Sequence, residues 1–417
     1  MTEITPESAS NFRFVGYSDQ GGQADGTQIM VTNDHAFIAH PFSNGATVLD
    51  VSDPRSPKVV NRLPVHKKSW SIHLQAAEGL LLVIEEFNFY SVFNEGSSYY
   101  DASVDGMDSS RFGRRGEDYS AGMRVYDIKD PANPRAIGFM EVAGLGLHRI
   151  WWTGGRYAYA SAFLDGFTDH ILIVIDMADP IHPRECGRWW LPGMNKAAGE
   201  TADWSGRVAL HHAIVADGVA YAAWRDGGMT LLDVADPGDI KLIARRNWSP
   251  PYAGGTHTCL PLTDRQLLVV ADEAVRDIDV EGIKPTWIFD IRTPENPVSI
   301  ATVPVPADQD YFKKGGHFGP HNLWENRPDG YRSSRYLFET YQSAGLRLFD
   351  LKDAYHPVEI GHFVPPPPAF SMDARAPGAR QVLHSADLYV APNGLAYITD
   401  FNAGLYIAEW TGAEAVF

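Results

Sequence analysis

An all-β fold made of repeated units is indicated by two observations on the sequence. Short runs rich in Val, Ile, Leu and Tyr alternate with Gly, Pro, Asn and Asp, and helical periodicity is nearly absent. Six of these runs lead into almost the same phrase, an aspartate followed by an apolar residue and a turn that usually contains prolines. The six copies are VLDVSDPRSP (48–57), VYDIKDPANP (125–134), VIDMADPIHP (174–183), LLDVADPGDI (231–240), IFDIRTPENP (288–297) and LFDLKDAYHP (348–357).

The interval between the copies predicts the architecture. The repeated aspartates lie roughly 50 to 80 residues apart, which is too long for helical solenoids and suits four-stranded blades with loops. These residues are Asp50, Asp127, Asp176, Asp233, Asp290 and Asp350. A seventh unit, LAYITDFNAGLYIAEW (395–410), has the strands but ends before the turn. Six complete units and one truncated unit predict a single seven-bladed β-propeller domain over residues 1–417.

The N-terminus is expected to close this ring. A short strand follows each turn, for example PRAIGFMEV (134–142), and NFRFVGYSD (11–19) has the same character without a preceding turn. We therefore expect residues 11–18 to form the outermost strand of the blade built mainly from residues 383–410. Such closure removes a free sheet edge, which would otherwise favour aggregation.

The repeated strands resemble those of the LVIVD-repeat family. The resemblance is carried by strands such as LIVIDMADP (172–180) and TLLDVADP (230–237), and similar units cover almost the whole chain. It implies a propeller. It implies no activity, because the family is defined by the repeat itself and function must be argued from the site.

Composition excludes several classes of partner. The net charge of −17 argues against nucleic acid and against an anionic membrane surface. No apolar run reaches the roughly 20 residues that span a bilayer. The first residues, MTEITPESAS, lack the basic and apolar regions of a secretory signal, and Cys186 and Cys259 do not make a disulfide framework. We expect a cytoplasmic protein.

Two segments interrupt the repeat, one at about 87–122 and a proline-rich loop at about 364–381. Long loops of this kind often serve as lids or binding loops. We expect the 87–122 insertion to cover the channel mouth, as a lid or through contact with a second copy of the chain in a homo-oligomer; the alternative is an insertion without a role. Its aromatic and basic residues are Tyr90, Tyr99, Tyr100, Tyr119, Arg111, Arg114 and Arg115.

A histidine recurs at the start of the first strand in successive blades. These strands line the central channel of a propeller, so equivalent side chains converge on its axis. Neutral imidazole is the commonest metal ligand in proteins. The candidate ligands are His73, His148, His211 or His212, His257, His321 and His384, with His73, His212, His257 and His321 as first choices.

Carboxylates and tryptophans are expected on the same face of the ring. A carboxylate there could orient a ligand imidazole or act as acid or base. The candidate catalytic residues are Glu86, Asp226, Glu273 and Glu339. Trp70, Trp224 and Trp324 are candidates for an apolar substrate pocket, and blade packing is the alternative for each.

These features predict a metal-dependent enzyme that acts on a small organic molecule at the propeller axis. Fe(II) or Zn(II) is the expected metal, with Mn and Cu as alternatives, because histidines are abundant and cysteines are few. Oxidative chemistry is preferred, and metal-dependent hydrolysis, isomerisation or lyase chemistry are alternatives. The competing class is a non-catalytic propeller scaffold that binds another protein.

Overall fold

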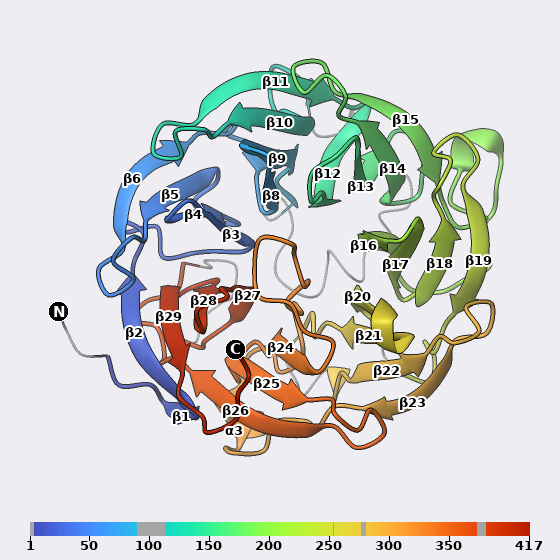
Figure 1. The fold of residues 1–417 in the computed structure, drawn as a ribbon. Helices are drawn as coiled ribbons and strands as arrows, with labels where there is room; N and C mark the ends of the chain where they lie inside the picture. The colour runs from blue at the N-terminus through green and yellow to red at the C-terminus, as the bar shows by residue number, and fades with distance from the viewer. Residues whose placement is uncertain (1–3, 90–112, 253, 277–280, 373–380) are drawn as a thin grey trace.

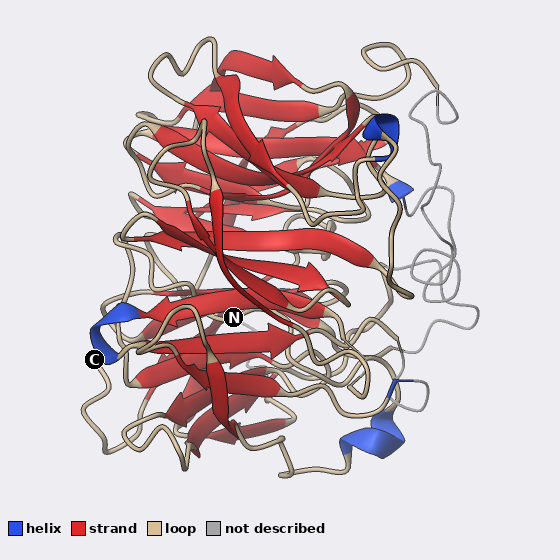
Figure 2. Ribbon diagram, turned by 90° about the vertical axis from the view of Figure 1, so that its right-hand side faces the viewer, coloured by secondary structure: helices blue, strands red, loops and turns tan. Residues whose placement is uncertain are grey.

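The computed structural model describes residues 4–89, 113–252, 254–276, 281–372 and 381–417. Their regular structure is almost entirely β-strand, with short helical segments at η3 (Lys196–Ala198), η4 (Thr263–Arg265) and α3 (Tyr311–Lys314). The strands form antiparallel sheets arranged in a ring (Figure 1), which Figure 2 shows from the side. The prediction of an all-β, propeller-like fold is confirmed. No helix among the described residues is long and apolar enough to cross a membrane.

Successive strands form antiparallel meanders that run from the axis to the outer rim (Figure 1). The first half of the chain contributes β3 (Ile29–Thr32), β4 (His35–Ala39), β5 (Ala46–Asp50) and β6 (Lys58–Leu63); β8 (Leu74–Ala77), β9 (Leu80–Phe87), β10 (Gly122–Asp127) and β11 (Arg135–Glu141); and β12 (Gly144–Trp151), β13 (Tyr157–Leu164), β14 (Ile171–Asp176) and β15 (Arg184–Trp189). The short strand β7 (Ser69–Trp70) also pairs with β9.

The second half continues in the same way. It contributes β16 (Val208–Ala216), β17 (Val219–Arg225), β18 (Met229–Asp233) and β19 (Lys241–Arg246); β20 (Thr256–Leu262), β21 (Leu267–Asp272), β22 (Thr286–Asp290) and β23 (Val298–Thr302); β24 (Tyr336–Thr340), β25 (Leu346–Asp350) and β26 (Val358–Val364); and β27 (Ser385–Val390), β28 (Leu395–Asp400) and β29 (Gly404–Trp410). Leu323 bridges to Glu339 on the axial side of β24.

The N-terminal strands lie on the outer edges of the last two meanders. β2 (Phe12–Ser18) pairs with β29, with Phe12 opposite Trp410 and Ser18 opposite Leu405. β1 (Ser8–Ser10) pairs with β26. Strands from the two ends of the chain therefore share sheets.

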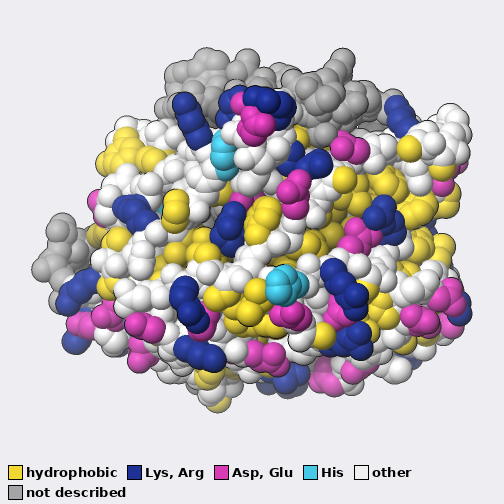
Figure 3. All heavy atoms as spheres, turned by 90° about the horizontal axis from the view of Figure 1, so that it is seen from above, with side chains coloured by type: hydrophobic (Ala, Val, Ile, Leu, Met, Phe, Trp, Pro, Cys, Tyr) yellow, Lys and Arg dark blue, Asp and Glu magenta, His cyan; other side chains and the backbone are white. Residues whose placement is uncertain are grey.

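The core lies between neighbouring sheets. All six residues of β14 are buried, because this strand is covered on both faces, whereas the outer strand β6 is mostly exposed. Burial on both faces explains the nearly continuous hydrophobic runs of the middle strands. The outer wall carries interspersed charges of both signs on the side that Figure 3 shows.

The repeated aspartates stabilise the turns that follow the third strands. Asp50 Oδ1 accepts the backbone N–H of Ser52 at 2.9 Å, and Asp233 Oδ1 accepts that of Ala235 at 3.0 Å. The same bond to the residue two positions later occurs at Asp127, Asp176, Asp290 and Asp350. This is the Asx-turn geometry, so these carboxylates are explained without catalysis.

Each turn also packs against the outer strand of the preceding meander. A Cβ on Gly187 of β15 would lie 1.9 Å from the carbonyl oxygen of Pro237 in the next turn, so the backbones approach as closely as only glycine permits. Gly138 of β11 meets the carbonyl oxygen of Pro180 in the same manner, at 2.7 Å from its built Cβ. The Asp–Pro phrase therefore connects adjacent meanders.

Much of the predicted 87–122 insertion lies outside the described residues, including Tyr90, Tyr99, Tyr100 and Arg111, and so do residues 373–380 of the proline-rich loop. The described end of the insertion is anchored. Tyr119 is buried and its ring lies 5.5 Å from that of Phe87, while Arg115 donates to Glu141 at 2.7 Å.

Candidate metal centre

Histidines from the axial ends of successive meanders lie next to one another around the axis. The ring centroids of His73 and His148 are 5.1 Å apart, and those of His148 and His211 are 5.0 Å apart. The ring centroid of His257 is 3.6 Å from that of His211, and the ring centroid of His321 is 4.6 Å from that of His257. Each of these side chains comes from a different meander, and they are buried, with His148 slightly exposed at 11%.

Three of these imidazoles have their Nδ1 atoms fixed by backbone carbonyls. His73 Nδ1 lies 2.5 Å from the backbone oxygen of His148, and His211 Nδ1 lies 2.8 Å from that of His257. His321 Nδ1 bonds in the same way to the backbone oxygen of Ala386. A carbonyl oxygen can only accept, so Nδ1 carries the proton and Nε2 presents its lone pair.

The other two imidazoles are held at Nδ1 by side chains. His148 Nδ1 lies 3.2 Å from Glu86 Oε2, and His257 Nδ1 lies 2.9 Å from the Thr258 hydroxyl. The partners that fix Nδ1 in metal-binding histidines are typically carboxylates and backbone carbonyls, as in most of this ring. All five imidazoles therefore use Nδ1 for positioning; in His73, His211 and His321 the carbonyl partner leaves Nε2 as the nitrogen for a ligand.

Burial favours the neutral form of four of these histidines. It lowers the pKa of His73, His211 and His257 well below the usual value, and the positive charge of Arg149 contributes to each shift. Burial also lowers the pKa of His148 to about 4, although Glu86 opposes the shift. Neutral imidazole is the form that binds metals.

A chain of charges extends outward from His148. Glu86 bonds to His170 Nε2, His170 Nδ1 lies 2.6 Å from Asp169 Oδ1, and Arg207 Nε donates to Asp169 at 2.8 Å. Burial alone would raise the pKa of Glu86, but His170 and His148 hold it at about 2. Burial alone would lower the pKa of His170, but Glu86 and Asp169 raise it to about 9. His170 is therefore a buried cation that fixes Glu86.

Glu273 lies on the opposite flank of the ring. Its Oε1 is 3.4 Å from His321 Nε2 and its Oε2 is 3.7 Å from His257 Nε2. Burial would raise the pKa of Glu273, but Arg225 and His257 outweigh it and hold the carboxylate ionised. Arg225 donates to Glu273 directly. The described residues thus offer two groups with ligand atoms within 4.8 Å of one another, Glu86–His148–His170 and His257–Glu273–His321.

The sequence prediction for the pair His211 and His212 is corrected. His212 lies away from the ring, with Nε2 at 2.9 Å from Glu325 Oε1, and His211 takes the ring position. The physical reason is an irregularity in β16, whose pairing with β17 shifts register between Val208 and His212. Such a bulge breaks the simple alternation of side chains along a strand.

His384 lies at the end of the series. Its ring is 5.8 Å from that of His321, stacks on Phe401 at 4.2 Å and is 5.0 Å from that of His317. It is partly exposed, as His148 is. It is therefore the least central of the candidate ligands.

Of the other predicted site residues, Trp70 is close to the ring. Its indole N–H donates to Glu86 Oε2 at 2.8 Å, and its ring is 6.2 Å from that of His148. Trp224 and Trp324 are packing residues instead: Trp224 donates to Thr230 at 2.8 Å, and Trp324 packs against Tyr389 at 5.0 Å. Their expected place in a substrate pocket is corrected.

Two predicted carboxylates also lie elsewhere. Asp226 accepts the backbone N–H groups of Arg207 at 2.8 Å and Gly255 at 3.1 Å, so it organises loops. Glu339 is buried in β24 and accepts from the Thr286 hydroxyl, and burial raises its pKa to about 8. Both are therefore removed from the catalytic candidates.

His170 and Arg149 are the residues that sequence reasoning missed. His170 precedes the third strand of its meander, outside the repeat position used to find the others. The local signal is the dipeptide Asp169–His170 immediately before a hydrophobic strand. Arg149 directly follows a ring histidine on β12.

Comparison with known proteins supports the repeat. A family model of the LVIVD repeat matches residues 21–63. The chain carries an LVIVD repeat. The resemblance of its strands to that family is thereby confirmed, and no functionally curated protein matches the chain.

Solved structures show the same fold at low sequence identity. A periplasmic gluconolactonase of Pseudomonas aeruginosa is 13% identical, with 97% of each chain covered and a TM-score of 0.53. A putative 6-phosphogluconolactonase of Bacteroides fragilis is 13% identical, with 81% of this chain and 84% of that chain covered and a TM-score of 0.52. The WD40 repeats of RRP9 are 9% identical, with 98% and 99% covered and a TM-score of 0.56. These likenesses establish a propeller fold.

Proposed function

We propose that this protein is a metal-dependent enzyme that acts on a small organic molecule at the axial histidine centre. One observation carries the proposal: five histidines from five meanders lie side by side around the axis, and each has its Nδ1 engaged by a protein group. Packing alone does not require the same nitrogen to be fixed in every ring. The metal ligands would be a subset of His73, His148, His211, His257 and His321.

Imidazole ligands with nearby carboxylates suit Zn(II) and Fe(II), and also Mn and Cu. Such a metal, when bound, polarises a substrate oxygen or acidifies a water molecule. The protein's own groups have separate roles. Glu86, fixed by Trp70 and His170, orients the His148 ring. Glu273 is an ionised carboxylate beside two ring nitrogens and can accept a proton from substrate or water.

Hydrolysis is the reaction class that we place first within this proposal. Two proteins of similar fold are named as lactonases, and the donor set suits a metal that activates water. The oxidative chemistry preferred from sequence has no counterpart among these relatives, and isomerisation or lyase chemistry stays an alternative.

Metal analysis tests the proposal directly. Protein purified without an affinity tag should contain a stoichiometric transition metal by mass spectrometry. The quadruple variant H73A/H211A/H257A/H321A should lose it while keeping a β-type circular dichroism spectrum. The matched control is H182A/H356A, which removes two turn histidines whose side chains are 80% and 83% exposed. Metal-free wild-type protein, or full occupancy in the quadruple variant, would contradict the proposal, and the former would favour a scaffold.

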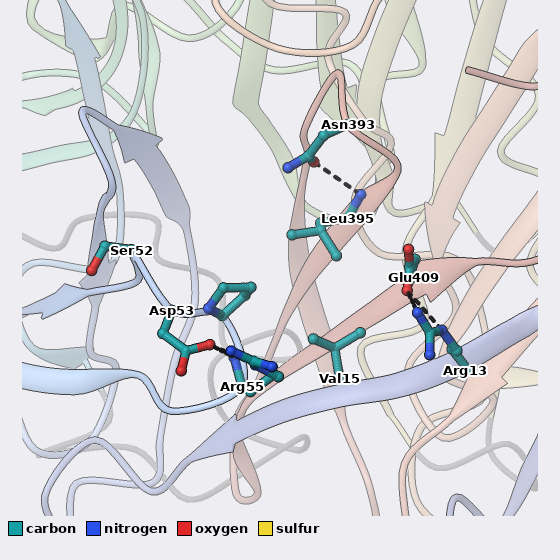
Figure 4. Close-up of a pocket in the computed structure, with 9 residues that line it drawn as sticks. Arg13, Val15, Ser52, Asp53, Arg55, Asn393, Leu395 and Glu409 are labelled. Atoms are coloured by element: carbon teal, nitrogen blue, oxygen red, sulfur yellow. Dashed lines mark hydrogen bonds and ion pairs between the residues drawn. The ribbon is translucent and has the colours of Figure 1, made fainter.

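We further infer a seven-bladed ring closed by β2. The pairing of β2 with β29 shifts register between Phe14 and Gly16, as the pairing of β14 with β15 does between Val174 and Ile175. A Cβ on Gly16 would lie 1.9 Å from the carbonyl oxygen of Pro54, which repeats the relation of Gly187 to the next turn. Figure 4 shows this junction, where Arg13 of β2 donates to Glu409 of β29 at 2.7 Å. These features support β2 as a fourth strand.

We also propose that the 87–122 insertion borders the entrance to the centre. The described residues at its two ends lie beside the strand that carries Trp70. The rings of Phe89 and Trp70 are 5.9 Å apart, and the backbone N–H of Ser120 donates to the hydroxyl of Ser69, the residue before Trp70. Replacing residues 90–112 by a short Gly/Ser linker should accelerate metal removal by a chelator, measured as the rate of metal loss. An unchanged rate would argue against a covering role.

A further inference from the structure

Arg149 is a buried cation with unused donors beside the histidine ring. It follows His148 on β12, and its side chain is fully buried. Its Nη2 donates to Glu325 Oε1 at 2.7 Å. Among the described residues, Nε and Nη1 have no hydrogen-bond acceptor. A guanidinium carries five N–H donors, and buried donors are nearly always paired, so Arg149 has capacity for an acceptor from outside the chain.

Arg149 occupies an axial position. Its positive charge lowers the pKa values of His73, His211 and His257, which come from three different meanders. The same charge also favours a lower pKa for Glu325, which precedes β24, and for Asp387 of β27. Its partner Glu325 Oε1 also lies 2.9 Å from His212 Nε2 of β16, so residues of three meanders meet at this ion pair, directly after the ring residue His148 in sequence.

The charges around the centre favour an anionic ligand. Glu86 and Asp169 are balanced by His170 and Arg207, Glu273 is balanced by Arg225, and Glu325 is balanced by Arg149; the partners are bonded in each group. A divalent metal held by the ring would add positive charge, and an anion next to Arg149 would reduce it.

We propose that Arg149 is the anion-binding residue of the axial centre, and that the substrate of the proposed enzyme carries a carboxylate. This inference rests on the proposed function, since the anion would be bound beside the metal. Arginine suits the role because it presents several N–H donors to a planar carboxylate and stays charged when buried. The alternative is that Arg149 serves only as the counter-ion of Glu325.

Calorimetric titration with acetate and its neutral isostere acetamide tests the inference on the protein as purified. Acetate should bind and acetamide should bind roughly 10-fold more weakly or worse, because only the carboxylate makes charge-assisted bonds. R149Q should weaken acetate binding by roughly 10- to 100-fold, and R149K should retain part of it. Since R149Q leaves Glu325 buried without its cation, R149Q/E325Q provides a second variant in which the pair is neutral.

The matched control is H212Q, which disturbs the same Glu325 carboxylate and leaves Arg149 in place. Its acetate affinity should equal that of the wild type. Equal acetate affinity in R149Q/E325Q and wild type would overturn the inference, and so would equal binding of acetamide or no binding of acetate by the wild type.

Metal content measured on the same samples separates this inference from the proposed function. If the protein contains stoichiometric metal but its acetate affinity is unchanged by substitution of Arg149, the anion site is refuted and the proposed metal-dependent enzyme is not. If the protein contains no metal but its acetate affinity falls when Arg149 is substituted, the metal-dependent enzyme is refuted and the anion site is not.

Discussion

The repeated aspartates of the turns and the repeated histidines of the axis are held by different kinds of partner. Asp233 accepts the N–H of Ala235, two residues away, so one turn satisfies its own carboxylate. His211 donates to the backbone oxygen of His257, which belongs to the next meander. Repetition alone therefore does not distinguish a residue held within its own turn from one held between two meanders, whereas the origin of its partner does.

This difference has a physical consequence. A turn aspartate can be removed with a local effect, because its bond closes a short loop. His73, His148, His211 and His321 are held by residues of a neighbouring meander, so their orientation depends on how two meanders approach each other, whereas His257 is held by the adjacent Thr258.

Loss of the N-terminal strands should have the largest effect. Deleting residues 1–20 removes both β1 and β2 and exposes the edges of β26 and β29. Unpaired edges favour aggregation, and an open ring no longer fixes the axial histidines. We expect a lower melting temperature, lower solubility and reduced metal content. Thermal unfolding identical to that of the full chain would argue strongly against closure by β2.

Substitution of Glu86 should affect the centre more than substitution of its neighbour Glu85. E86Q removes the carboxylate that holds His148 and balances His170, so metal affinity should fall by roughly 10- to 100-fold. E85Q is the matched control, because Glu85 bonds instead to Arg124 at 2.5 Å. Competition with a fluorescent chelator measures both affinities. Equal values for the two variants would remove Glu86 from the centre.

The sequence was sufficient for the all-β, propeller-like fold and for the proximity of most of the axial histidines. The Asp–Pro phrase marks the end of each third strand, and the strands between copies follow from alternation of hydrophobic runs and turns. Histidines such as His73 and His257 were found because they occupy one repeat position. That inference needs only the position of each histidine within its repeat, which the local pattern of strands and turns specifies.

Other parts of the site depend on features that a repeat does not encode. The bulge in β16 exchanged the roles of His211 and His212. Trp224 is near the expected rim in sequence, but its side chain turns into the sheet interface towards Trp189. His170 reaches Glu86 from a different strand and a different meander. Contacts between distant strands decide these positions.

Glu339 should make stability depend on pH without affecting the metal. Burial raises its pKa to about 8, above the ordinary value of 4.5, so between these values the folded state holds a proton that the unfolded state releases. The free energy of unfolding should therefore fall as pH rises through this window, by up to about 1.4 kcal/mol per pH unit. Urea unfolding of E339Q should lack this part of the slope. The same slope in both proteins would show that Glu339 is ionised when folded.

The smallest effect is expected at a turn aspartate. D233A removes the bond to the Ala235 N–H, and a single hydrogen bond of this kind contributes about 1 kcal/mol to stability. Metal content should stay at the wild-type value, since the lost partner lies within the same turn. H211A is the matched comparison, because it removes a repeated residue whose partner lies on the next meander, and it should lower metal content. Equal loss of metal in D233A and H211A would mean that the turns help to position the axial histidines. It would contradict the expectation that only residues held between two meanders affect the centre.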